Sequence, residues 1–333
     1  MNNKIRVCIA GKNNIAVNAL NYLITNYQSK IDLCCLPNPN DRGEDGWQLS
    51  FKKYCDENKI NRIELEELRK IEDLIFISLE YSEIIDTKYF LTNELFNIHF
   101  SLLPKYRGMY TSAMPIINGE QESGVTLHKI DNGIDTGDII DQLCFKITTN
   151  DTARDLYYKY LDYGFDLFKN NIEALLNKKY KCYKQPILNA SYYSKKTINF
   201  NDLKINFFKS AYEVNNQIRS FIFREFQLPK FNNWGINRTE ILHERSFKKP
   251  GYIFSEDMTS FIVSTNDYKI KLYKDYYDEL WSVCENGDSK RLFEIIPHIP
   301  NIKLKNRYNL DAIAIAESKN HHDLIKILLK HVE

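Results

Sequence analysis

The sequence lacks several features that define common enzyme classes. Its seven cysteines contain no CxxC pair, and the chain has no GxGxxG loop, no Walker-type loop and no GxSxG turn. These absences argue against zinc or dithiol sites, nicotinamide or P-loop nucleotide binding, and serine hydrolase chemistry. Because His321 and His322 are adjacent and point in different directions on a helix, we expect no metal site.

An excess of charge is also missing. The 45 basic residues balance 44 acidic ones, so a nucleic acid partner is not expected. The longest apolar runs have the length of a strand, and the N-terminal MNNKIRVCIAG enters a strand directly. We therefore expect a cytoplasmic protein without membrane contact, whose cysteines are reduced and mostly buried thiols.

The length of 333 residues predicts two or three domains. The first 180 residues alternate strand-like and helix-like segments, which predicts βαβ units. Strands are expected at 5–11, 31–37, 73–79, 95–101, 124–131 and 137–147, and helices over about 14–26, about 47–58 and from Asp151 onward. The predicted fold class is α/β, with a Rossmann-like, mostly parallel sheet flanked by helices.

The remaining sequence changes character twice. Residues 181–276 predict a smaller β-rich domain, with a helix over about 210–223 and a hairpin at 260–274 that turns at Asn266-Asp267. In residues 277–333, the segments 283–296 and 315–328 superimpose at an offset of 32, which resembles ankyrin repeats. Two repeats cannot bury a continuous core alone, so we expect this short all-α module to pack against the rest of the protein. The alternative is that two amphipathic helix pairs are similar by chance.

The stretch FNIHFSLLPKYRG (96–108) holds the strongest chemical signal. Alternation along a strand puts Asn97 and His99 on one side. The downstream HKIDNGIDTGDII (128–140) is a glycine-rich loop that can return Asp135 to this strand end. The three side chains would form a hydrogen-bonded acid/base set with an amide beside it. The alternative is a strand-end histidine and a loop aspartate that only satisfy hydrogen bonds.

These two motifs carry a family resemblance. Asn97 begins N-x-H-x-S-L-L-P and Asp135 lies 38 residues later in D-x-G-x-D-T-G-D-I. The pattern resembles the 10-formyltetrahydrofolate-dependent formyltransferases, which include methionyl-tRNA formyltransferase and the sugar N-formyltransferases. The resemblance covers about residues 1–180 and implies 10-formyltetrahydrofolate as formyl donor, with no metal.

The chemistry of formyl transfer explains the three residue types. Asn97 can donate an N–H to the oxygen that becomes negatively charged, an interaction worth about 3 kcal/mol of barrier. His99 can take the proton of the attacking amine while Asp135 orients the imidazole. Whether His99 or Asp135 handles the proton stays open at this point.

The resemblance also implies binding segments for the formyl donor. The segment 78–83 and the loop 131–138 should hold the pterin through backbone groups, and residues 101–107 should form a wall of the active site. The candidate cofactor-binding residues are Ser78, Leu79, Glu80, Tyr81, Leu103, Asp131, Gly133 and Asp138.

The acceptor is inferred from two loops. GKNN (11–14) and DRGEDGWQLS (41–50) resemble loops of nucleotide-sugar formyltransferases, which modify dTDP-linked amino-dideoxy sugars for bacterial surface polysaccharide (O-antigen). The candidate substrate-binding residues are Lys12, Asn13, Arg42, Asp45, Trp47 and Arg107. The first loop could instead be a purely structural turn, and the tryptophan could pack the start of the next helix.

We therefore expect a formyltransferase acting on a dTDP-3-amino-3,6-dideoxyhexose. The alternatives are methionyl-tRNA formyltransferase and a non-catalytic protein that senses nucleotide sugars. By the same resemblance we expect a homodimer, with residues 223–232 shaping the sugar pocket or the dimer contact. The ankyrin-like tail is expected to bind a protein or a second, regulatory nucleotide sugar, or only to cover the β-rich domain.

Overall fold

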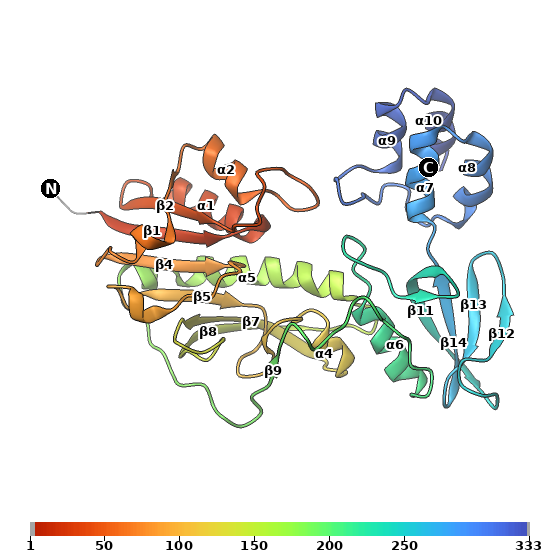
Figure 1. Ribbon diagram of the computed structural model, residues 1–333, viewed down its shortest axis with the longest axis horizontal. Helices are drawn as coiled ribbons and strands as arrows, with labels where there is room; N and C mark the ends of the chain where they lie inside the picture. The colour runs from red at the N-terminus through yellow and green to blue at the C-terminus, as the bar shows by residue number, and fades with distance from the viewer. Residues whose placement is uncertain (1–3, 332–333) are drawn as a thin grey trace. The chain divides into compact units, whose positions relative to one another are not determined.

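The computed structural model describes residues 4–331 and divides the chain into two compact units, Met1–Asn199 and Phe200–Glu333 (Figure 1). The division into three domains, with boundaries after residues 180 and 276, remains a prediction. Among the described helices, none combines the length and the apolar character that a membrane span requires.

The first unit is built on a seven-stranded sheet with the order β3-β2-β1-β4-β5-β7-β8. Its strands are β1 (Ile5–Gly11), β2 (Ile31–Pro37), β3 (Asn61–Arg62), β4 (Leu74–Leu79), β5 (Leu95–His99), β7 (Glu122–Lys129) and β8 (Ile139–Lys146). The first five in this order run parallel, whereas β7 pairs antiparallel with β5 and β8 antiparallel with β7. The predicted mostly parallel sheet is therefore confirmed, and the bounds of β1 and β2 match the prediction to the residue.

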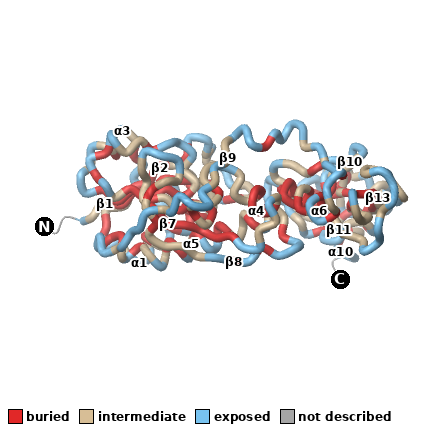
Figure 2. The backbone as a smooth tube through the Cα atoms, turned by 90° about the horizontal axis from the view of Figure 1, so that it is seen from below, coloured by how far each residue is buried: buried red, intermediate tan, exposed pale blue. Residues whose placement is uncertain are grey.

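Both faces of this sheet are covered, because alternate residues of its strands point to opposite sides. Val7 and Ile9 of β1 pack with α1 (Asn13–Tyr27), α2 (Phe51–Glu57) and α5 (Ala153–Leu176). Cys8 and Ala10 point to the opposite face, where the core is completed by α3 (Leu65–Leu68) and by residues before β5. Figure 2 shows the buried stretches running through these strands and α5.

Capping residues explain where the helices begin. Thr152 caps α5 and forms a reciprocal capping box with Asp155. The helix expected over 47–58 is shorter, because Ser50 caps it and the helix begins at Phe51. Short elements complete the unit: η1 (Thr87–Tyr89), β6 (Arg107–Gly108), α4 (Met114–Ile117) and β9 (Tyr192–Tyr193).

The second unit contains an antiparallel sheet with the order β10-β11-β14-β13-β12. Its strands are β10 (Lys230–Phe231), β11 (Trp234–Arg245), β12 (Ile253–Glu256), β13 (Ser260–Ser264) and β14 (Tyr268–Lys274). Helix α6 (Ala211–Ser220) packs Val214 and Ile218 against this sheet. The expected hairpin is confirmed, since β13 and β14 are joined through residues 265–267.

The C-terminal part of this unit consists of two helix pairs. They are α7 (Tyr277–Asn286) with α8 (Ser289–Ile295), followed by η2 (Ile296–His298), and α9 (Ala312–Ser318) with α10 (His322–Leu329). The pairs share a core of their own, which Trp234 of β11 extends. Arg224 pairs with Asp275 at the entrance to α7, and its guanidinium lies over the Tyr277 ring. The internal repeat thus coincides with helix pairs, while their assignment as ankyrin repeats remains a prediction.

Gly11, at the end of β1, lies where β1 and β4 approach each other closely. A Cβ atom here would lie 2.1 Å from the carbonyl oxygen of Leu79 in the neighbouring strand β4, which as backbone cannot turn aside. We predict that Gly11→Ala lowers the free energy of unfolding by about 1–3 kcal/mol, measured by urea denaturation. The exposed Ser29→Ala is the control and should stay within about 0.5 kcal/mol of the wild type. A Gly11 variant with the wild-type unfolding curve would contradict the predicted clash.

Candidate active site

A cavity of about 540 Å³ opens at the carboxyl ends of β4 and β5 in the first unit. Its volume lies in the range of small-molecule sites. The lining residues come from segments that are far apart in sequence: 78–85 after β4, 97–100, 108–111, 128–135, and Tyr192 with Lys195. Crevices of this kind at strand ends are where open α/β sheets bind ligands.

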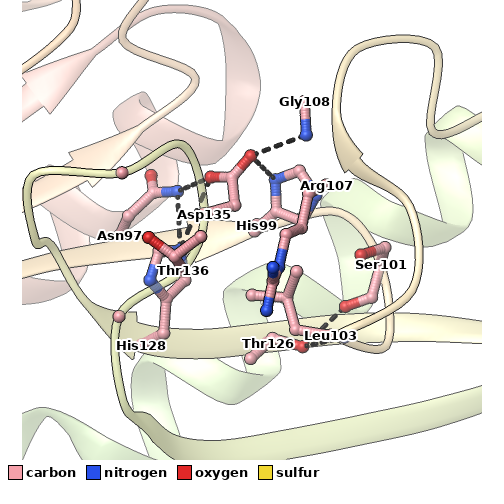
Figure 3. Close-up of polar contacts among 12 residues, drawn as sticks. Asn97, His99, Ser101, Leu103, Arg107, Gly108, Thr126, His128, Asp135 and Thr136 are labelled. Atoms are coloured by element: carbon pink, nitrogen blue, oxygen red, sulfur yellow. Dashed lines mark hydrogen bonds and ion pairs between the residues drawn. The ribbon is translucent and has the colours of Figure 1, made fainter. Parts of the chain in front are cut away.

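The structure brings Asn97, His99 and Asp135 together in this cavity (Figure 3). The Asp135 carboxylate lies between the other two: Oδ2 is 3.4 Å from His99 Nδ1, and Oδ1 accepts from Asn97 Nδ2 at 3.5 Å. The backbone N–H of Gly108 donates to Oδ2 at 2.8 Å. The loop from 131 to 138 therefore returns to β5 as the sequence predicted.

The hydrogen bonds of His99 define which of its nitrogens can exchange a proton. Nε2 lies 2.8 Å from the carbonyl oxygen of Tyr106. Since a carbonyl only accepts, Nε2 carries a hydrogen. The site of proton gain or loss is then Nδ1, the nitrogen that faces the Asp135 carboxylate.

A second histidine, His128, completes the cluster and was missed by the sequence reasoning. It is buried on β7 directly opposite Asn97 in the strand register. Its Nδ1 donates to the carbonyl of Lys129 at 2.7 Å, which leaves Nε2 of the neutral ring to accept from Asn97 Nδ2 at 3.1 Å. His128 thereby fixes the amide of Asn97 with its nitrogen toward the carboxylate. The signal that could have found it is its place in HKID, a strand run next to the loop that carries Asp135.

The electrostatics favour an ionised Asp135. Burial by itself would raise the pKa of its carboxyl, but the charge of His99, the neighbouring His128 and the N–H of Gly108 outweigh burial. Together they hold the pKa of Asp135 well below its usual range. A carboxylate fixed beside His99 Nδ1 stabilises the imidazolium that forms when this nitrogen takes a proton.

Comparison with known proteins agrees with this chemistry. A family model described as formyl transferase matches residues 49–172. Two solved structures resemble the chain over 81% of its length: an N-formyltransferase from Helicobacter canadensis complexed with folinic acid and dTDP-3-aminofucose, and WlaRD, a sugar 3N-formyltransferase in the presence of dTDP and 5-N-formyl-THF. The first is 47% identical, covered over 100% of its chain, with a TM-score of 0.76; the second is 50% identical, covered over 97%, with a TM-score of 0.74.

The chain belongs to the formyltransferase family. A curated relative, the methionyl-tRNA formyltransferase of Fervidobacterium nodosum, is 30% identical over 229 residues, which are 65% of this chain and 71% of the relative.

Most of the cofactor residues predicted for this formyltransferase lie at the cavity. Ser78, Glu80, Tyr81, Asp131 and Gly133 line it. The other three do not line it: Leu79 is buried in the core, Leu103 is buried with its N–H donating to Thr126, and the carbonyl of Asp138 accepts from Lys129. Ser82 and Glu83 of the predicted segment 78–83 also line the cavity, as do Ile84, Ile85, Phe100, Met109 and Thr111, which were not predicted.

The predicted substrate residues of this formyltransferase lie outside the cavity lining. Asn13 donates to the Glu80 carboxylate, which lines the cavity, and Tyr157 donates to the same group. Burial raises the pKa of Glu80, opposed by the charge of Lys12 and by these hydrogen bonds. Trp47 packs 5.7 Å from the Tyr157 ring, measured between centroids.

Three further predicted residues are spread more widely. Arg42 is exposed, and Asp45 pairs with Lys53 at 2.6 Å. Arg107 donates to Gln185 through Nε and Nη2. Among residues 4–331, no three His, Cys, Asp or Glu side chains are grouped so that they could hold a metal ion. The binding roles of all these residues remain predictions.

The pKa of Asp135 predicts a change in acid stability. A carboxyl whose pKa is lowered in the folded state stabilises the protein above its unfolded value, about 3.9, and this contribution is lost as the pH falls toward the folded value. We predict that the free energy of unfolding of Asp135→Asn falls less steeply than that of the wild type between about pH 4 and pH 2, measured by urea denaturation at each pH. The exposed Asp73→Asn is the matched control and should follow the wild type. Parallel curves for wild type and Asp135→Asn would refute the prediction.

Proposed function

We propose that this formyltransferase moves the formyl group of 10-formyltetrahydrofolate to the amino group of a dTDP-linked 3-amino-3,6-dideoxyhexose. The observation that carries the reaction is the set of Asn97, His99 and Asp135 in one cavity. The acceptor is supported by the 47% and 50% identity to structures of an N-formyltransferase with dTDP-3-aminofucose and of a sugar 3N-formyltransferase.

The residues divide the reaction between them. One N–H of Asn97 Nδ2 is held by His128 Nε2; the other, which makes only a 3.5 Å contact with Asp135 Oδ1 here, turns to the formyl oxygen as that oxygen gains negative charge. His99 Nδ1 takes the proton that the amine loses on attacking the formyl carbon, and the neighbouring Asp135 stabilises the resulting imidazolium. The tetrahydrofolate nitrogen leaves, and the proton held on His99 can return to it.

The residues that line the cavity suit a folate. Ile84, Ile98, Ile130 and Ile134 supply apolar contacts, while Asp131 adds a polar group. Apolar walls with polar groups placed among them are typical of cofactor sites. We therefore place the pterin between the segment 78–85 and the loop 131–135, next to the catalytic set.

The nucleotide end of the sugar is assigned to the region around Lys12, Asn13 and Trp47. This region adjoins the cavity through Glu80, which Asn13 contacts. It also includes the N-terminus of α1, where Lys12 at the N-cap position makes no side-chain cap and the N–H of Asn14 donates to Gln48 Oε1. The N-terminus of a helix and a lysine beside it suit a diphosphate.

The alternative function, formylation of methionyl-tRNA, has weaker support. The methionyl-tRNA formyltransferase of Fervidobacterium nodosum is 30% identical, against 47% and 50% for the two solved sugar-formyltransferase structures. The nearly neutral charge of the chain also gives little drive for RNA binding.

Further parts of the proposal follow from the resemblance alone. We place the reaction in the cytoplasm, in a homodimer, as a step toward surface polysaccharide such as O-antigen. Residues 223–232 would shape the sugar pocket or the dimer contact. The tail would bind a protein or a second, regulatory nucleotide sugar.

The reaction is tested by incubating the protein with 10-formyltetrahydrofolate and a panel of dTDP-3-amino and dTDP-4-amino sugars, with the product followed by mass. We predict formylation of 3-amino sugars and a kcat about a hundredfold lower for Asn97→Ala, because one oxyanion donor is lost. The exposed Gln28→Ala is the control and should match the wild type. No product with any sugar of the panel, or product only with methionyl-tRNA, would overturn the proposal.

The tail is tested by deleting residues 278–333 and measuring formylation against the concentration of dTDP-amino sugar. A regulatory tail predicts a changed dependence on this concentration. Because the deletion uncovers Trp234 at the shared core, thermal unfolding is measured in parallel. Lower stability with wild-type kinetics would mean that the tail only covers the β-rich domain. Unchanged kinetics and unchanged stability would exclude both the regulatory role and the covering role.

A further inference from the structure

The chain that follows α5 returns to the active site. Its segment 183–195 runs beside residues 104–110 in the first unit. Arg107 N donates to the carbonyl of Ser191 at 2.9 Å and Met109 N to that of Tyr193 at 2.8 Å, so β9 pairs with β6. Tyr192 and Lys195 of this segment line the cavity. The segment is therefore part of the site, although it lies about 50 residues beyond the catalytic loop.

Gln185 of this segment joins two loops at once. Its Nε2 donates to the carbonyls of Asp135 and Gly137, each at 2.8 Å. Its Oε1 accepts from Arg107 Nε at 3.1 Å and Nη2 at 2.6 Å. Because the two carbonyls can only accept and the guanidinium can only donate, a single orientation of the side-chain amide satisfies all four bonds. Both N–H donors and both acceptor positions are thus used.

Both loops that Gln185 joins present a group to the catalytic set. Asp135 has a left-handed backbone with φ of 54°, a conformation that costs a non-glycine residue free energy and needs support from its surroundings. Gly108, next to Arg107, also has a positive φ of 84°, and its N–H donates to the Asp135 carboxylate. Gln185 therefore holds the backbone of Asp135, the residue that bears the carboxylate. Through Arg107 it also holds the turn whose Gly108 N–H donates to this carboxylate.

We propose that Gln185 is a positioning residue for formyl transfer: it holds the Asp135 loop and the Arg107–Gly108 turn in the spacing that sets the carboxylate against His99 Nδ1. The proposal rests on the function given above. Gln185 does not line the cavity, so its effect is on the placement of Asp135 and not on substrate contact.

The first test is Gln185→Ala in the full-length protein, assayed with 10-formyltetrahydrofolate and the dTDP-amino sugar that the wild type uses. A misplacement of about 1 Å can cost about a hundredfold in rate, so kcat should fall by about tenfold to a hundredfold. The KM for the sugar should change less than about threefold, because no substrate contact is removed. The exposed Gln121→Ala is the matched control and should keep wild-type kinetics. A kcat within about twofold of the wild type in Gln185→Ala would overturn the proposal.

A second variant separates the two halves of the side chain. Gln185→Glu keeps the acceptor for Arg107 but removes both N–H donors and places a negative charge beside two carbonyl oxygens. If the donors position Asp135, its kcat falls at least as far as that of Gln185→Ala. Wild-type turnover in Gln185→Glu would show that the Arg107 contact alone suffices and would overturn the assignment.

Hydrogen–deuterium exchange provides a readout that does not need activity. In Gln185→Ala we expect faster exchange in segments 106–110 and 133–137, with other segments of the first unit unchanged. Unchanged exchange there, or a general loss of protection with wild-type kcat, would reduce Gln185 to an ordinary structural residue. A wild type that formylates no dTDP-amino sugar would count against the proposed function, whereas the exchange result would still decide the role of Gln185.

Discussion

The ionised carboxylate of Asp135 is the interaction on which the site depends. Its side chain is only 14% exposed, so the charge needs compensation, which comes from His99 on β5, with His128 on β7 beside it, and from the N–H of Gly108. A buried charge stays ionised only when such partners replace its lost hydration. Each partner therefore fixes the position of a chemically active group while it stabilises the charge.

The register between β5 and β7 makes this arrangement possible. Asn97 lies opposite His128, and His99 lies opposite Thr126. Thr126 is fully buried, donates to the carbonyl of Ser101 and accepts from Leu103 N. A slip of one residue would turn the side chains of a strand to the other face. These buried bonds thus fix which side chains of the two strands meet at the carboxylate.

The sequence predicted those parts that depend on local pattern. Alternation and turn residues were enough for β1, β2 and the hairpin of β13 and β14, and alternation placed Asn97 and His99 on one side of β5. The loop bearing Asp135 was assigned through its motif. His128 was missed, because its role arises from the pairing of two strands and not from its neighbours in sequence. The start of α2 was misjudged because Ser50 acts as a cap inside a polar run that extends the helical pattern.

Gln185 escaped the sequence for a related reason. It lies beyond residue 180, where the catalytic domain was expected to end, but within the first compact unit, which runs to Asn199.

The backbone of the site shows why local rules fail here. Glu80, Tyr106 and Asp135 all adopt positive φ values of 58°, 61° and 54° without being glycine. Such residues cost free energy locally and persist only where surrounding contacts determine them. Tyr106 N donates to Ser191 Oγ, and Gln185 Nε2 donates to the carbonyl of Asp135. Tyr106 and Asp135 are therefore held by a segment that follows them by 50 residues or more, so the geometry of the set of Asn97, His99 and Asp135 is a property of the whole first unit and not of its two motifs.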